Sequence, residues 1–185
     1  MGQTLRELCL GAQDRSIGLL ACHTGPWYAV MVKGQQERFI HEAFQQKAIE
    51  SFLPLYWAAR RWSDRVKRVQ LPLFPGYLFC RFQPFQRLPL LRTPGVKTIV
   101  SSGSEMLPVA NEDILRIRRL IASNCSLEPW PFLQAGRRVR VHSGPLDGLE
   151  GIFAEFRGAC GVVISLELLQ RSVMVSLARE QVTPI

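Results

Sequence analysis

The pattern of apolar and polar positions predicts two regions that are built differently. Across residues 27–121, runs of aromatic and β-branched residues typical of strands alternate with segments of helical periodicity. Beyond residue 135, only short strand-like runs separated by glycine-containing turns occur. The sequence therefore predicts an α+β fold, in which an antiparallel sheet with flanking helices forms an α/β sandwich and precedes a small all-β, SH3-like barrel.

The same pattern divides the chain into four parts. Residues 1–25 are expected to be a weakly ordered leader, and residues 26–122 the α/β domain. Residues 123–134 contain Pro129 and Pro131 and are expected to form a stiff linker, followed by the barrel at 135–185. Within the first domain we expect strands, helices and one exposed basic hairpin, in this order: strand 27–32, helix 35–49, strand 52–57, hairpin 58–70, strand 77–82, helix 85–92, strand 96–100, a loop at 101–108, and a helix from Asn111 as its cap to about 123.

The most distinctive segment runs from Leu71 to Phe82 and combines prolines, a glycine and several aromatic residues. Pro75 and Gly76 predict a tight bend that leads into a strand. Because side chains alternate along a strand, Tyr77 and Phe79 share one face and Leu78 lies on the other. The aromatic face has two open interpretations at this point, a core surface or a docking surface.

The formal net charge is +8, and its position matters more than its size. Residues 27–121 hold 15 basic and 7 acidic side chains, so the whole excess lies in this segment. A concentrated positive field suits phosphate backbones or an acidic protein surface. A solvated basic face that only aids solubility is the alternative.

Several classes of function lack support in the sequence. The five cysteines are widely spaced without a C-x-x-C, which argues against a disulfide framework or zinc site and for a cytoplasmic protein. The three histidines lack metal spacing, and neither a phosphate-cradling glycine motif nor a nucleophile elbow occurs. No apolar run approaches the ~18 residues of a membrane span. We therefore expect a monomeric binding protein that is not an enzyme, has no cofactor or metal and does not bind membranes.

Three local signatures carry a resemblance to a known family. They are Trp-Tyr-Ala-Val at 27–30, Pro-Leu-Phe-Pro-Gly-Tyr-Leu-Phe at 72–79 followed by Thr-Pro-Gly-Val at 93–96, and Gly-Pro-Leu-Asp-Gly-Leu-Glu-Gly at 144–151. In this order and spacing, residues 27–185 resemble the NusG family of transcription elongation factors, which join an NGN domain to a KOW barrel. Residues 151–155 and 166–175 are more similar to specialised RfaH-like paralogues of capsule and exopolysaccharide operons.

The resemblance implies a factor that binds RNA polymerase at the clamp and suppresses pausing or termination. An operon-specific role is the expectation, with a housekeeping NusG-type factor as the alternative. A KOW-type RNA-binding or ribosome-associated protein is a second alternative, although residues 135–185 are nearly neutral.

By motif position, the resemblance implies two contacts with RNA polymerase. The β′ clamp would bind an apolar patch made of Tyr77 and Phe79, with Phe74 and Pro75 at its rim and Trp27 beneath. For Trp27 alone, a core role is the favoured interpretation. The β subunit would be contacted where specialised members carry His-Thr-Thr, but this chain has Gln86 and Arg87 there, which weakens that assignment.

The resemblance also implies contacts with the non-template DNA strand and with a partner of the KOW domain. Lys33, Arg38, His41 and Arg92 match the DNA positions, with ordinary surface charge as the alternative. Rho or a small-subunit ribosomal protein would contact the KOW domain near Ile164, Leu168, Leu169 and Val173.

The segment around Leu168 and Leu169 carries two further expectations, one about the exposure of these side chains and one about the fold of the KOW domain. We expect both leucines to be exposed, because they replace a Phe-Gly turn. The resemblance to RfaH-like paralogues also implies a switch of the KOW domain to a helical hairpin that masks the aromatic face. The good helix formers at 166–171 agree with such a switch, whereas the valines around them favour strands.

Overall fold

The computed structural model describes residues 25–62, 65–133, 136–156 and 159–185. The leader expected at 1–25 lies outside this part of the chain, apart from Gly25. The N-terminal sheet is antiparallel, with the order β2-β5-β1-β6 and β9 paired to β1. Its strands are β1 (Trp27–Val32), β2 (Glu50–Phe52), β5 (Tyr77–Arg81), β6 (Val96–Ile99) and β9 (Pro108–Val109).

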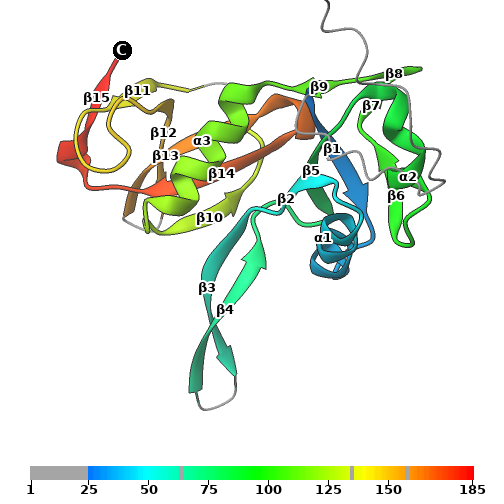
Figure 1. Ribbon diagram of the computed structural model, residues 1–185. Helices are drawn as coiled ribbons and strands as arrows, with labels where there is room; N and C mark the ends of the chain where they lie inside the picture. Colours follow the sequence, from blue (N-terminus) through cyan, green and yellow to red (C-terminus); the bar gives the residue numbers. More distant parts are fainter. Residues whose placement is uncertain (1–24, 63–64, 134–135, 157–158) are drawn as a thin grey trace, which may run out of the picture.

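Helices α1 (Glu37–Gln46) and α2 (Arg87–Leu91) cover one face of this sheet (Figure 1). The apolar side chains between them form the first core, which is composed of Tyr28, Val30, Val32, Ile40, Phe44, Leu53, Leu78, Cys80, Phe82, Leu90 and Ile99. Burial of one face of each strand and one stripe of each helix is what holds this layer together. The predicted layer of helices on an antiparallel sheet is confirmed.

A two-stranded ribbon projects from this domain. It consists of β3 (Leu55–Trp62) and β4 (Arg65–Pro72), which pair with each other and belong to no larger sheet (Figure 1). The expected basic hairpin is therefore present, but it begins at Leu55 and not at residue 58, and it includes most of the separate strand expected at 52–57. The break at Leu53–Pro54 separates β2 from β3, because proline donates no ladder hydrogen bond.

The third helix, α3 (Asn111–Ala122), joins the two halves of the molecule. Ala110 occupies the N-cap position and Asn111 is already the first helical residue, so the expected cap was wrong by one position. The segment 101–108 also differs from the expected loop. It contains a small hairpin of β7 (Ser101–Ser102) and β8 (Glu105–Met106), and then enters β9.

The C-terminal β module, residues 127–184, is a six-stranded antiparallel sheet with the order β10-β14-β13-β12-β11-β15. Two short 3-10 turns interrupt it, η2 (Glu167–Leu169) and η3 (Arg179–Gln181). Its strands are β10 (Leu127–Trp130), β11 (Arg138–Val141), β12 (Glu150–Phe156), β13 (Ala159–Leu166), β14 (Arg171–Ser176) and β15 (Val182–Pro184). The predicted all-β region is confirmed, and the helix formers at 166–171 make only the single turn η2. Residues 127–130, expected in the linker, are a strand of the sheet.

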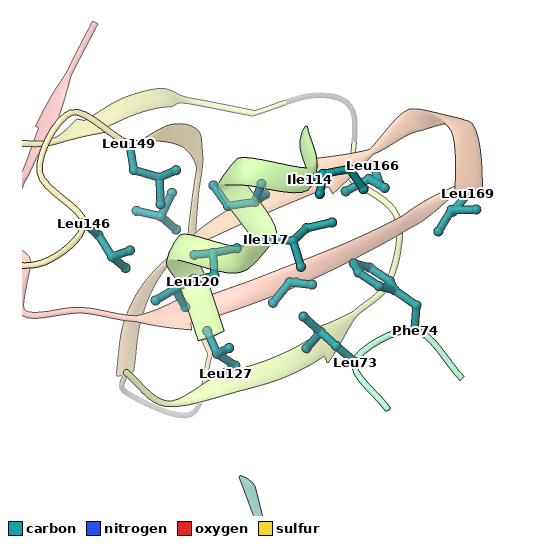
Figure 2. Packing of buried hydrophobic residues seen from close by; sticks show 14 of the residues in the cluster. Leu73, Phe74, Ile114, Ile117, Leu120, Leu127, Leu146, Leu149, Leu166 and Leu169 are labelled. Atoms are coloured by element: carbon teal, nitrogen blue, oxygen red, sulfur yellow. The ribbon is translucent and has the colours of Figure 1, made fainter. Parts of the chain in front are cut away.

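The second core joins the two halves of the molecule into one continuous cluster (Figure 2). It takes side chains from the other face of the N-terminal sheet, from the apolar stripe of α3 and from the C-terminal β module. Its buried members include Trp27, Leu73, Phe74, Phe79, Ile114, Ile117, Leu120, Leu127, Val139, Leu146, Leu149, Val162, Ile164, Leu166, Leu169, Val173 and Val175. The aromatic face of β5 is therefore one wall of an interdomain core.

Candidate docking surface

A glycine-containing turn positions the aromatic residues at the entry to β5. Pro75 and Gly76 form its centre, and Gly76 adopts a φ of 82°, which requires the freedom of glycine. The Tyr77 amide donates to the Phe74 carbonyl at 3.1 Å. The Gly76 amide donates to the buried carboxylate of Glu37 at 2.9 Å, which ties the turn to the start of α1. The turn is thus held from the helix side of the sheet.

The two faces of β5 have different partners, as the alternation predicts. Leu78 and Cys80 belong to the core beneath α1 and α2. Phe79 and the half-buried Tyr77 face the interdomain core. The division of this strand into a face for its own domain and an aromatic face is therefore confirmed.

The aromatic patch consists of Trp27, Phe52, Phe74, Tyr77 and Phe79. Phe74 meets Phe79 edge-on with ring centroids 6.0 Å apart, and Phe52 stacks on Phe79 at 6.2 Å. Both geometries are favourable for aromatic pairs. Phe52 was missing from the predicted patch, because its place opposite Phe79 follows from the pairing of β2 with β5.

The aromatic patch is covered in this structure. Phe79 is 0% exposed, Phe74 1% and Trp27 4%, whereas Tyr77 is half-buried and Pro75 is exposed. Figure 2 shows Phe74 and Leu73 beside the apolar side chains of α3 and the C-terminal β module. The cover is made by α3 and by the strands of the C-terminal β module, and not by a helical hairpin.

Cations of α3 add polar contacts around this cover. The Arg118 guanidinium lies 5.4 Å from the Trp27 ring centroid and 5.1 Å from that of Phe52, a cation–π geometry. The Arg119 side chain donates to the carbonyls of Pro145 and Asp147 in the C-terminal β module. The helix therefore contacts both halves of the molecule through neighbouring residues.

Acidic groups meet at the other end of this contact. Burial raises the pKa of Asp113, which Arg116 partly offsets and the nearby Glu112 and Glu167 reinforce. Since Glu167 belongs to η2, a like-charge repulsion acts between α3 and the C-terminal β module. The contact between α3 and the C-terminal β module is thus mainly apolar, with favourable hydrogen bonds from Arg119 at one end and like-charge repulsion between Asp113 and Glu167 at the other.

The turn at Leu168 and Leu169 was expected to expose both side chains, and this expectation was wrong. Leu169 is only 5% exposed, and the half-buried Leu168 also packs against the interdomain core. The 3-10 turn η2 folds them inward, and Gln170 completes the reversal with a left-handed φ of 49°. Of the other expected partner-binding residues, Ile164 and Val173 are also buried.

The expected DNA-contacting residues are not alike. Lys33, Arg38 and Arg92 are exposed, and Arg38 donates to the carbonyl and side-chain oxygens of Gln70 at 3.2 Å. His41 is only partly accessible, because its Nδ1 lies 2.8 Å from the Ser51 hydroxyl. Burial lowers the pKa of His41, which favours its neutral form.

An exposed apolar surface surrounds the residues expected at the β subunit. The Gln86 side chain accepts a hydrogen bond from the Gln83 amide at 3.1 Å, and Arg87 is exposed at the start of α2. Around them Phe85, Leu88 and Leu91 are 77%, 53% and 39% exposed. The three-residue spacing of Phe85, Leu88 and Leu91 indicated that they share one face of a helix. The sequence of a short helix does not show, however, whether that face is buried or exposed.

The projecting ribbon is the second cationic surface and was left without a role by the sequence. It carries Arg60, Arg61, Arg65, Lys67 and Arg68, all exposed and without an ion pair among the described residues. Trp57 is 56% exposed, and the Arg68 guanidinium lies 5.6 Å from its ring centroid. In the described ranges, acidic, cysteine and histidine side chains form no cluster suited to a metal ion, and none of the helices is long and apolar enough to cross a membrane.

Comparisons with known proteins found one matching family model and several similar solved structures. A family model described as "NusG: Transcription termination factor nusG" matches residues 25–118. A solved structure titled "Domain interaction in Thermotoga maritima NusG" is 22% identical, with a TM-score of 0.58, and covers 91% of this chain and 99% of that chain. The structure titled "Crystal Structure of MjSpt4:Spt5 complex conformation B" is 17% identical, with a TM-score of 0.29, over 86% of this chain and 96% of that chain.

Proposed function

This chain belongs to the NusG family of transcription factors, and on that premise we propose that its aromatic patch docks on the β′ clamp of RNA polymerase. Members of the family are transcription elongation factors and not enzymes, and membership implies binding to RNA polymerase. The finer assignment is an operon-specific, RfaH-like antiterminator that suppresses pausing or termination.

The observation that carries this proposal is the division of β5. Its Leu78 face has a complete core of its own under α1 and α2, so the N-terminal sheet does not need the aromatic patch to bury that face. The opposite face is covered by α3 and by a module that follows it in the chain. Removal of the module would expose Phe74, Tyr77 and Phe79, which are large apolar anchors of the kind that dominate interfaces.

The cover supports the operon-specific role. A patch that is buried in the free protein can bind polymerase only in the fraction of molecules whose C-terminal β module has moved away. Such a factor responds to an event that shifts this equilibrium, for example contact with a DNA element or a second partner. Rho or a small-subunit ribosomal protein would then bind the released module near Leu168, the most accessible of its expected contact residues.

Two exposed surfaces supply the remaining contacts. Lys33, Arg38 and Arg92 contact the non-template strand, and the ribbon β3–β4 contributes phosphate contacts through its exposed cations. His41 is the least accessible of the expected set and lies on the same helix as Arg38. The β subunit is contacted at Gln86 and Arg87, together with the exposed apolar residues beside them.

Binding to core RNA polymerase tests the docking proposal. In the full chain, Tyr77→Ala should weaken binding about tenfold or more, as truncation of an interface anchor does. Phe39→Ala is the matched control, because Phe39 is an aromatic residue of α1 that is 62% exposed and lies outside the aromatic patch. Both are also measured in a Leu169→Ala background, which weakens the cover. Equal binding of the Tyr77 variant and the control in both backgrounds would show that the patch is not the docking surface.

The ribbon is tested separately through salt dependence on an elongation complex. Neutralising Arg65 and Lys67 together to glutamine should lower the slope of log K against log salt by about 2, one for each lost phosphate contact. Affinity for core polymerase without DNA should stay unchanged. An unaltered slope would remove the ribbon from the proposed nucleic-acid surface.

A further inference from the structure

We propose that β10 is a displaceable strand, called the latch strand below. Its release opens a peptide-binding edge on β14 and at the same time lets the C-terminal β module move farther from α3. The inference extends the proposed function and starts from the sheet order. β14 has β13 on one side and β10 on the other, and β10 is the end of the sheet. If β10 leaves, β14 becomes an open edge.

The register shows which backbone groups β10 covers. The Ser176 amide donates to the Ser126 carbonyl at 3.1 Å, whereas the Leu177 amide donates to the Cys160 carbonyl on the opposite side. Because the direction of hydrogen bonding alternates along a strand, the groups of Ser172, Met174 and Ser176 point to β10. Those of Val173 and Val175 point to β13. Release of β10 would therefore free one regular row of donors and acceptors.

The latch strand is short and carries a proline. β10 has four residues, and its Pro129 pairs with Val173. This is a non-hydrogen-bonded pair in the register above, so the missing amide of Pro129 costs no bond to β14 and lies at the outer side. The proline keeps a further strand from adding outside β10. An incoming strand can use this edge only by replacing β10.

A serine pair fastens the far end of the segment. The Leu133 amide donates to the Ser172 hydroxyl at 3.1 Å, and the Ser165 hydroxyl donates to the Leu133 carbonyl at 2.6 Å. The two hydroxyls lie 2.8 Å apart, and Ser172 is buried. Departure of the segment would leave these two hydroxyls without their backbone partner. Any extended peptide in the same register restores those bonds, which makes the edge selective for strand-like occupants.

The tether lengths connect this edge to the cover of the aromatic patch. While β10 is paired, only residues 123–126 separate α3 from the C-terminal β module, and they span at most about 14 Å. After release, residues 123–137 form the tether and reach at most about 50 Å. A module on the short tether stays beside the aromatic patch and competes with polymerase at high effective concentration. An extended peptide that takes the β14 edge therefore also lengthens the tether. The favoured occupant has an aliphatic side chain at the position of the buried Leu127.

Amide hydrogen exchange on the full chain is the first test. Leu127→Ala removes the buried anchor of β10 and should speed exchange at Ser172, Met174 and Ser176 about tenfold relative to Val173 and Val175. Glu128→Ala, at an exposed position of the same strand, should leave both groups unchanged. If both groups of amides accelerate equally in the Leu127 variant, β10 opens only with the whole sheet and the proposal fails.

A peptide competition is the second test. The probe is a synthetic peptide with the sequence of residues 124–133, with serine in place of Cys125. It should bind the Leu127→Ala chain about tenfold more tightly than the wild type. The lock is Glu128→Cys with Met174→Cys, a hydrogen-bonded pair whose Cα atoms lie about 5.5 Å apart, within disulfide range. The oxidised chain should not bind the peptide, and the same chain reduced should. Equal binding of the peptide to the oxidised and the reduced chain would overturn the proposal. Neither test uses polymerase, so these failures are distinct from failure of the docking proposal.

Discussion

Leu169→Ala should lower the stability of the protein and raise its affinity for RNA polymerase. Leu169 is 5% exposed and packs in the interdomain core from the turn η2. Truncation of a buried leucine costs about 2–5 kcal/mol of unfolding free energy. We assign about 1 kcal/mol of this to contact across the domains, on the reasoning that roughly half of the side chain becomes exposed when the C-terminal β module leaves. That amount shifts the balance between covered and uncovered molecules about fivefold.

The expected result is thus up to about a fivefold gain in polymerase affinity, because affinity scales with the uncovered fraction. Urea unfolding measures the stability, and fluorescence anisotropy with core polymerase measures the affinity. Val163→Ala is the matched control, since Val163 is 1% exposed but lies outside the interdomain core. It should reduce stability without a gain in affinity. If Leu169→Ala lowers both quantities, or changes affinity no more than the control, the cover does not regulate docking.

Three further changes test individual features. Gly151→Ala would place a Cβ 2.5 Å from the Val162 Cγ1 atom and should lower the unfolding free energy by about 1–3 kcal/mol in urea titration; an unchanged midpoint would contradict the packing. Gly76→Ala meets no atom closer than 3.8 Å, so its cost should be only the strain of the positive φ, about 1–2 kcal/mol by the same measurement, and a larger loss would indicate a clash. Burial lowers the pKa of His41 below its ordinary 6.5, so the unfolded chain binds more protons as the pH falls through about 6.5, and stability should drop between about pH 7.5 and 5.5. Unfolding curves of His41→Gln should show a weaker dependence on pH over that range, and an equal dependence would exclude His41 as the cause.

Local patterns were most informative where a single element decides the outcome. Alternation in residues 77–80 separated the two faces of β5 correctly, because strand geometry leaves no other arrangement. The basic hairpin was also visible, since its run of cations is a local feature of the sequence. Helical periodicity was less exact. Phe39 lies among the apolar residues of α1 but is 62% exposed, so the sheet covers a narrower stripe of this helix than its apolar positions indicate.

Pairings between distant segments were beyond the reach of such patterns. The proline-containing segment around Pro129 indicated a linker, yet it completes a sheet, because an edge strand tolerates a missing amide. Leu168 and Leu169 looked like exposed turn residues, but η2 turns them toward a surface supplied by another domain. Whether an apolar turn is favourable depends on the surface that packs against it, and here that surface comes from residues far away in the chain.

The sequence by itself determined the α+β and all-β halves, the signatures of the family and the aromatic composition of the residues around β5. These follow from local propensity, side-chain alternation and turn chemistry, which act over a few residues. Only the tertiary structure decided that the aromatic patch is covered, that Phe52 belongs to it and that residues 127–130 close the β14 edge. Burial of apolar surface is not directional, so the same aromatic residues satisfy a core or an interface, and the choice is made by the segment that packs against them.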